Sequence, residues 1–192
     1  MPFATPTDSL PSRPRRVLVA GTSASGKTTL ARAIGERLSI PHIEIDALFH
    51  GPDWTPRETF VAEVEEFSSR PGWVTEWQYD AVRPMLADRA DLLVWLDLPR
   101  ALVMKQVLRR TWGRGMRRQE LWNGNVEPPL WTVFTDRDHI IRWAWTSHHQ
   151  NAERVQELHE RRPELTIVRL PSHQASQSWL DGPVRDAATK AG

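Results

Sequence analysis

The strongest constraint on the fold is the segment 21–28, Gly-Thr-Ser-Ala-Ser-Gly-Lys-Thr, which matches the pattern G-x-x-x-x-G-K-[S/T]. The apolar residues 17–20 before it predict a buried strand, and the spacing of Leu30, Ile34 and Leu38 after it predicts an amphipathic helix. Glycines let such a loop curl so that backbone N–H groups point at phosphate oxygens. The pattern therefore predicts a strand–loop–helix unit that binds a nucleotide; a glycine-rich turn that binds nothing is the alternative.

Two side chains of this loop have specific expected roles. Lys27 would reach the β and γ phosphates, and the hydroxyl of Thr28 is a hard oxygen ligand for Mg²⁺. Lys27 is one of only three lysines, beside 22 arginines, which fits a position where arginine cannot substitute. The sequence thus predicts ATP and Mg²⁺ as cofactors, with the nucleotide bound by Gly21, Thr22, Ser23, Ala24, Ser25, Gly26, Lys27, Thr28 and Thr29.

Strand-like and helix-like segments alternate along the rest of the chain. Such alternation favours a parallel sheet with helices on both faces, a three-layer α/β fold. In such folds ligands bind at the carboxyl ends of the strands. The predicted strands cover residues 17–20, 43–46, 73–75, 92–96 and 166–170.

The length of 192 residues suits one domain. Residues 1–14 are rich in proline, serine and threonine, which predicts a disordered N-terminal tail. The small, polar residues 181–192 predict a flexible C-terminal tail. The domain would then span residues 15–180, with an insertion at about 111–136 that is rich in glycine, proline, arginine and tryptophan.

Carboxylates stand at the ends of three predicted strands: Asp46, Glu76 and Asp97. A phosphoryl-transfer site needs an acid to hold Mg²⁺ or its waters, and often a second acid to orient the acceptor hydroxyl. We therefore expect Asp46 to act on the acceptor, and Asp97 and Glu76 to hold Mg²⁺ together with Thr28. The alternative for each acid is a structural role, such as capping the next helix.

The segment 100–120 carries seven basic residues and one acidic residue, a local charge of 7 − 1 = +6. Arginine forks bind phosphate oxygens and stabilise charge on a transferring phosphoryl group. Gly113 and Gly115 would let the segment move as a lid, and we expect Arg114, Arg117 and Arg118 to be catalytic. A solvated basic face, codon bias and a nucleic-acid patch are the alternatives.

Composition excludes several classes of protein. The absence of cysteine excludes a disulfide scaffold, a thiolate metal site and a cysteine nucleophile. The net charge of +1 gives no support for DNA binding, although DNA stays possible as a partner. The longest apolar run has five residues, too few to cross a membrane, and the N-terminus lacks the apolar core of a secretory signal. We expect a cytoplasmic protein; the sequence gives no oligomeric state.

Beyond the loop, several segments are similar to those of the small P-loop proteins described as adenylate-kinase-like or DNA topology modulation proteins. These segments are IEIDALFH (43–50), WTP (54–56), VWLDLPR (94–100) and ELWNGN (120–125). The resemblance implies the fold of nucleoside monophosphate and shikimate kinases, with a five-stranded parallel sheet in the order 2-3-1-4-5. It also implies ATP on residues 21–28, an acceptor near Asp46 and an arginine-bearing lid.

The resemblance has a departure after the third strand, where the family pattern is similar to D-G-N-Y and this chain has Glu76-Trp77-Gln78-Tyr79. The change would place the Trp77 ring where the acceptor approaches. The leading hypothesis is a small ATP-dependent kinase that phosphorylates a nucleotide or another small molecule. An ATP-binding regulatory or DNA-associated protein is the second hypothesis, and a nucleotide-binding protein with a degenerate acceptor site is the third.

Overall fold

The computed structural model describes residues 3–106 and 140–190, with the side chains of residues 140–149 left aside. Residues 100–106 are helical and follow β3. The elements, in chain order, are β1 (Arg16–Gly21), α1 (Lys27–Leu38), α2 (Ile45–Phe49), η1 (Pro52–Trp54), α3 (Phe60–Ser68), β2 (Trp73–Glu76), α4 (Arg83–Arg89), β3 (Leu92–Leu96), α6 (Ile140–Arg161), β4 (Thr166–Leu170), α7 (His173–Trp179), η4 (Leu180–Val184) and α8 (Arg185–Ala188).

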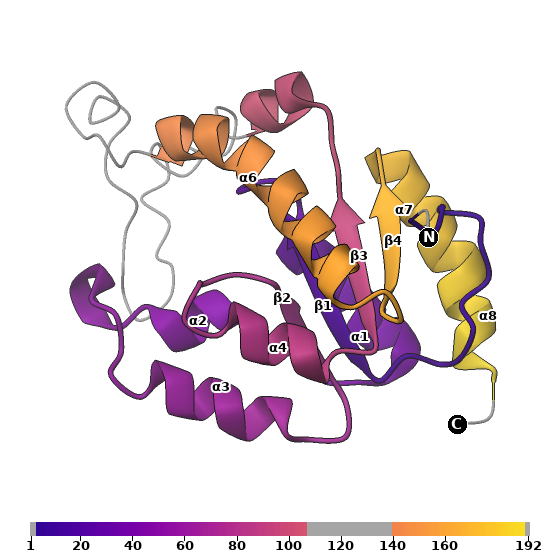
Figure 1. Ribbon diagram of the computed structural model, residues 1–192, viewed down its shortest axis with the longest axis horizontal. Helices are drawn as coiled ribbons and strands as arrows, with labels where there is room; N and C mark the ends of the chain where they lie inside the picture. Colours follow the sequence, from indigo (N-terminus) through magenta and orange to yellow (C-terminus); the bar gives the residue numbers. More distant parts are fainter. Residues whose placement is uncertain (1–2, 107–139, 191–192) are drawn as a thin grey trace.

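The described strands form one parallel sheet in the order β2-β1-β3-β4, so β1 lies between two neighbours. Helices cover both faces: α6 lies across one face together with α3 and α4, and α1 lies behind the sheet with α7 and α8 (Figure 1). The sheet strands are buried along almost their whole length, as both-face coverage requires. The predicted three-layer α/β architecture is confirmed.

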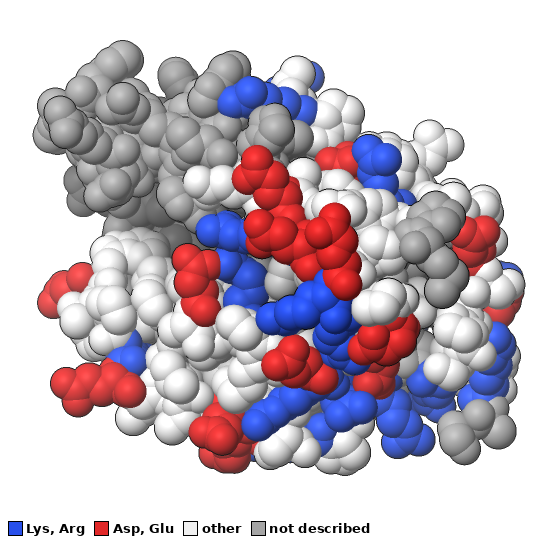
Figure 2. All heavy atoms as spheres, viewed as in Figure 1, with Lys and Arg blue, Asp and Glu red and all other residues white. Residues whose placement is uncertain are grey.

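Charges of both signs are interspersed on the face formed by α3, α4 and α6, where Lys and Arg alternate with Asp and Glu (Figure 2). Such mixing matches the near-zero net charge of the chain. Among the helices that the structure describes, none combines the length and the apolar character needed to span a bilayer.

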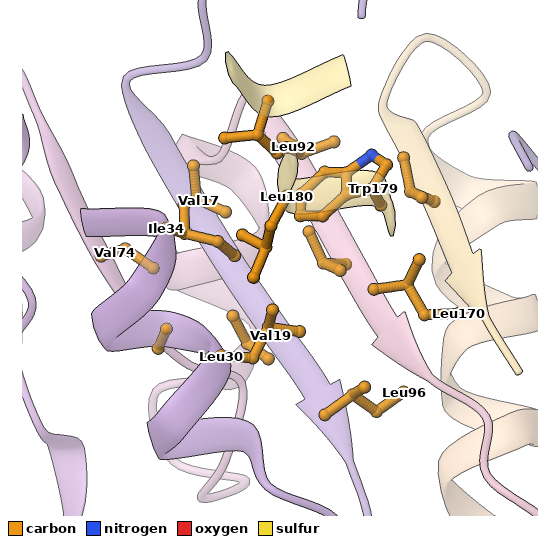
Figure 3. Close-up of a cluster of buried hydrophobic side chains, with 14 of the residues drawn as sticks. Val17, Val19, Leu30, Ile34, Val74, Leu92, Leu96, Leu170, Trp179 and Leu180 are labelled. Atoms are coloured by element: carbon orange, nitrogen blue, oxygen red, sulfur yellow. The ribbon is translucent and has the colours of Figure 1, made fainter. Parts of the chain in front are cut away.

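Two layers of apolar side chains hold the helices to the sheet. On the α1 face, Leu30 and Ile34 point toward Val17 and Val19 of β1, beside Trp179 (Figure 3). On the opposite face, the second layer is formed by side chains from α3, α4, α6 and the sheet, including Phe60, Val64, Phe67, Trp73, Leu86, Leu93, Trp95, Val155 and Leu158. Since both layers rest on β1, the position of the loop after β1 is fixed from two sides.

The predicted second strand, residues 43–46, does not form, so the sheet has four described strands and the predicted five-stranded order 2-3-1-4-5 is wrong. The segment before α2 pairs with β2 through a single bridge, between His42 and Val74, and the Ile43 N–H donates to the Val74 carbonyl at 2.9 Å. The next backbone N–H that could extend the pairing, that of Ile45, donates instead to the side chain of Glu76 at 3.2 Å. The chain then turns into α2, which places Asp46 in a helix rather than at a strand end.

The described parts of both expected tails, residues 3–14 and 181–190, contact the domain through buried residues. Ala4 makes a parallel bridge with Val168 at the edge of the sheet, and Leu10 is buried. At the other end, Val184 and Ala187 are buried in the layer beneath α1. Single apolar residues in polar surroundings are enough to anchor these segments, and composition alone does not reveal them.

Two valines of α3 give a matched test of the second apolar layer, because Val64 is fully buried and Val61 is 47% exposed. We expect Val64→Ala to lower the free energy of unfolding by about 2 kcal/mol, through lost burial and a residual cavity. Val61→Ala should change it by less than about 0.5 kcal/mol. Urea denaturation measures both values, and equal losses would contradict the assignment of this layer.

Candidate functional site

The loop between β1 and α1 has the backbone that its sequence predicts. A Cβ added to Gly21 would lie 2.7 Å from Ser25 Oγ and 3.1 Å from Leu96 Cβ, so only glycine fits there. Ala24 and Gly26 both have positive φ, 59° and 94°. The chain thus reverses direction within a few residues and enters α1 at Lys27.

Polar side chains of this loop are buried inside it. Lys27 is 7% exposed, and its Nζ donates to the carbonyl oxygen of Thr22 at 3.0 Å. Ser25 is 1% exposed, and its Oγ has no hydrogen-bond partner among the described residues. A buried ammonium and an unpartnered buried hydroxyl at the start of a 12-residue helix suit an anionic, oxygen-rich ligand. The loop therefore fits the phosphates of a nucleotide.

A second polar group lies around Asp46, in the first turn of α2. Its Oδ1 accepts a hydrogen bond of 2.6 Å from the Tyr79 hydroxyl and one of 2.8 Å from Gln78 Nε2. No hydrogen bond reaches Oδ2 from the part of the chain that the structure describes. One carboxylate oxygen is thereby held in place while the other is left to a further partner.

Tyr79 is fixed as the donor in this pair. Burial first, and then the negative charge of Asp46, raise the pKa of the Tyr79 hydroxyl above its usual value. The hydroxyl therefore keeps its proton at any physiological pH and donates it to Asp46. Tyr79 also has φ of 62°, a left-handed conformation that is uncommon for a bulky residue and that recurs at functional sites.

Aromatic rings surround this carboxylate. Phe49 stacks on Tyr79 with ring centroids 4.0 Å apart, and Phe60 meets Tyr79 edge-on at 5.2 Å. His50 packs edge-on against Trp54 at 5.1 Å. Burial lowers the pKa of His50, although Asp46 opposes this effect. The ring pairs hold α2, η1 and the turn after β2 together around Asp46.

Glu76, expected to hold Mg²⁺, is 1% exposed and already engaged. Its two carboxylate oxygens lie 3.2 Å from His42 Nε2 and 3.2 Å from the Ile45 nitrogen. Burial would raise the pKa of Glu76, but the hydrogen bond and charge of His42 and the Ile45 N–H outweigh it, so the pKa is lowered. Glu76 is thus charged at neutral pH and fixes the edge of the sheet where α2 begins.

Asp97, the other expected metal ligand, is held by an arginine of the neighbouring strand. Its Oδ2 accepts a hydrogen bond from Nε of Arg169 at 2.7 Å, and Nη2 of the same guanidinium lies 2.5 Å from that oxygen, an ion pair. The Arg169 guanidinium also lies over the Trp95 ring, 5.4 Å from its centroid. The pair connects the ends of β3 and β4.

No group of three or more acidic or histidine side chains that could hold a metal occurs among residues 3–106 and 150–190. Mg²⁺ commonly keeps several waters and binds through one or two protein oxygens plus substrate phosphates. A site of that kind would need Thr28 at the start of α1 and one carboxylate; of the two expected carboxylates, Glu76 is bound to His42 and Asp97 to Arg169.

Trp77 does not lie beside Asp46. Its ring is buried in the layer between the sheet, α4 and α6, and its Nε1 donates to the Arg83 carbonyl at 3.1 Å. The next two residues, Gln78 and Tyr79, are the ones that contact Asp46. The ring therefore lies outside the expected acceptor position.

The structure describes Thr29 but not the expected lid arginines. Thr29 is exposed on α1, and the expected lid at 111–136, with Arg114, Arg117 and Arg118, lies outside the described residues. Four residues escaped the sequence analysis as site residues: His42, Gln78, Tyr79 and Arg169. For Gln78 and Tyr79 a signal existed, since polar residues directly after a buried strand lie at the ligand-binding edge of a parallel sheet.

Comparison with protein-family models gives no match, and comparison with curated proteins gives none either. Among solved structures, a gluconokinase from Sinorhizobium meliloti 1021 is similar over 92% of this chain and 95% of its own, with a TM-score of 0.50 and 21% identity. Shikimate kinases from Bacteroides thetaiotaomicron and Aquifex aeolicus align over 88% and 86% of this chain, and 95% and 91% of their own. Their TM-scores are 0.45 and 0.46, at 14% and 11% identity. The chain shares the α/β fold of the gluconokinase.

The Glu76–His42 pair predicts that the free energy of unfolding depends on pH in the acidic range. Because the pKa of Glu76 is lowered in the folded state, its contribution is complete above pH 4.5, the ordinary glutamate value, and is lost as the pH falls through the lowered pKa. We expect Glu76→Gln to cost about 2–4 kcal/mol of unfolding free energy at pH 7, with the difference from wild type shrinking in acid. Denaturant unfolding over a pH series measures this. The exposed Glu36→Gln is the control, and a difference independent of pH would contradict the prediction.

Proposed function

We propose that this protein is a small ATP-dependent kinase that transfers the γ-phosphate of ATP to a hydroxyl or phosphate of a small acceptor. The observation that carries the proposal is the loop 21–28, with the Lys27 ammonium buried inside it and α1 starting directly behind it. Its fold, shared with a gluconokinase, supports the assignment. ATP and Mg²⁺ are the cofactors proposed with it.

The loop residues would act on the phosphates of ATP. Backbone N–H groups of residues 21–28 and the first turn of α1 would bind phosphate oxygens. Lys27 would exchange its contact with the Thr22 carbonyl for the β and γ phosphates, whose charge it neutralises. Thr28 would supply a hydroxyl ligand to Mg²⁺, with Asp97 or Glu76 acting through bound water; the metal would neutralise charge on the transferring group.

Asp46 would act on the acceptor. Its Oδ2 would accept the proton of the acceptor hydroxyl while that oxygen forms its bond to the γ-phosphorus and the bond to the β–γ bridging oxygen breaks. Tyr79 and Gln78, both bound to Oδ1, would hold the carboxylate in the required orientation. The products would be ADP and the phosphorylated acceptor. Arg114, Arg117 and Arg118 would close over the transferring group and exclude water.

Within the kinases, we propose that this protein belongs to the adenylate-kinase-like group, whose sequences the segments 43–50, 94–100 and 120–125 resemble. The acceptor class is best found by direct search. The pool should contain nucleoside monophosphates, because of that resemblance, and gluconate and other hydroxylated acids, because of the shared fold.

The direct test is incubation of the purified protein with Mg–ATP and this pool, followed by mass spectrometry for any acceptor that gains a phosphate. A product formed by wild type and not by Lys27→Ala supports the kinase. ATP binding without any transfer would overturn it in favour of the regulatory or DNA-associated protein. Affinity for DNA that falls steeply with salt would then be the expected finding.

Lys27→Ala should lower turnover by at least about a hundredfold, because the developing phosphate charge loses its buried ammonium. Lys190→Ala removes a lysine from the C-terminal segment, where Nζ binds the Leu10 carbonyl, and should leave turnover within about twofold. Steady-state kinetics with the acceptor found above measures both. Near-normal turnover in Lys27→Ala would contradict the proposed kinase activity.

Asp46→Asn should lower kcat by about a hundredfold or more, since the amide cannot take the acceptor proton. Tyr79→Phe removes only one of the hydrogen bonds that position Asp46, so it should lower kcat by a smaller factor of roughly ten with little change in KM for ATP. The exposed Asp53→Asn serves as the matched control. Equal kcat values for Asp46→Asn and Asp53→Asn would show that Asp46 is not the base.

A further inference from the structure

A cavity of about 330 Å³ lies between α4 and α6, on the face of the sheet opposite α1. This volume is within the usual range of small-molecule sites. It lies on the face shown in Figure 2, over α4 and α6, where basic and acidic side chains meet. The described residues that line it are Trp77, Asp80, Arg83, Pro84, Arg154, Glu157, Leu158 and Arg161.

Arg83 lines the cavity, and part of its hydrogen-bonding capacity is unused. Its side chain is 15% exposed, and its guanidinium lies over the Trp77 ring, 5.6 Å from the centroid. Its Nε is buried and has no hydrogen-bond partner among the described residues. Burial first, and then the nearby charge of Arg154, lower the pKa of Arg83, although Asp80 opposes both. The group stays charged at neutral pH, with a donor unused.

Arg154 of α6 forms the opposite wall and shares its counter-ion. Both guanidiniums approach the same atom, Oδ1 of Asp80: Arg83 through Nη1, and Arg154 through Nη2 at 3.6 Å. Asp80 itself is 79% exposed, which weakens its attraction for either partner. Two largely buried guanidinium groups therefore share one exposed carboxylate as their counter-charge.

The other charges of the cavity do not supply a second anion to this pair. Arg161 is bound to Asp88 at 3.3 Å. Glu157 lines the cavity but forms no ion pair with any residue that the structure describes. Its carboxylate would oppose an incoming anion or accept a hydrogen bond from a hydroxyl or amine next to it. Trp77 and Leu158 add an apolar floor.

We propose that this cavity binds the phosphate or carboxylate group of a small molecule between Arg83 and Arg154, with the Trp77 ring beneath it. The oxyanion supplies the second negative charge to the two guanidiniums, which share only Asp80. The site is separate from the loop 21–28, and the inference does not depend on the proposed kinase activity. In the sequence, Trp77 and Asp80 flank Gln78 and Tyr79, which bind Asp46. The turn after β2 therefore contributes both to this cavity and to the polar group around Asp46.

The test follows the indole N–H resonance of Trp77 by NMR in ¹⁵N-labelled protein, because this group donates to the Arg83 carbonyl. Comparison with Trp77→Phe assigns the resonance among the ten tryptophans. Inorganic phosphate and benzoate are titrated separately in buffer free of other oxyanions. The same titrations in Lys27→Ala remove any contribution from phosphate bound at the loop 21–28.

A saturable shift of the Trp77 resonance is expected, in Lys27→Ala as in wild type. Arg154→Gln should weaken binding about tenfold, through loss of a charge-assisted contact. Glu157→Gln should tighten it severalfold, since a like charge is removed. On α6, Glu157 is exposed and Arg154 partly exposed, and Arg70→Gln, at the exposed Arg70 after the end of α3, is the distant control. Saturation by phosphate or by benzoate identifies the group bound. The absence of saturation with both, or equal affinity in Arg154→Gln and Arg70→Gln, would overturn the proposal.

Discussion

The close packing at Gly21 is the constraint on which the rest of the structure depends. The backbone there passes so near Ser25 and Leu96 that no side chain fits, and this contact folds the loop back onto the end of β3. Because β1 is paired on both sides and covered on both faces, the contact has a rigid support. The buried Lys27 and the start of α1 are held at the carboxyl edge of the sheet as a consequence.

A second constraint, the buried carboxylate of Glu76, organises the other half of the site. By accepting from the Ile45 N–H it ends the pairing of this segment with β2 and begins α2. This brings Asp46 to the turn after β2, where Tyr79 and Gln78 reach its Oδ1. The same turn carries Trp77 and Asp80 to the cavity between α4 and α6. One buried acid and one tight turn thus arrange two groups of polar side chains on the same face of the sheet.

What could be predicted from the sequence was local. The strand before Gly21, the helix after Lys27 and the buried side of α3, with Phe60, Val64 and Phe67, all follow from residue spacing over a few turns. The assignment of 43–46 as a strand failed because a distant residue, Glu76, competes for the backbone of Ile45. The left-handed Tyr79 and the pairing of Asp97 with Arg169 likewise depend on contacts between strands that no local pattern records.

The central claim is that residues 21–28 bind ATP through the ammonium of Lys27. Calorimetric titration of Mg–ATP into wild type and Lys27→Ala tests it without knowledge of the acceptor. The account predicts one molecule of ATP bound per chain, and an affinity at least about tenfold lower in the variant. Equal affinity in the two proteins, or no binding to wild type, would contradict it.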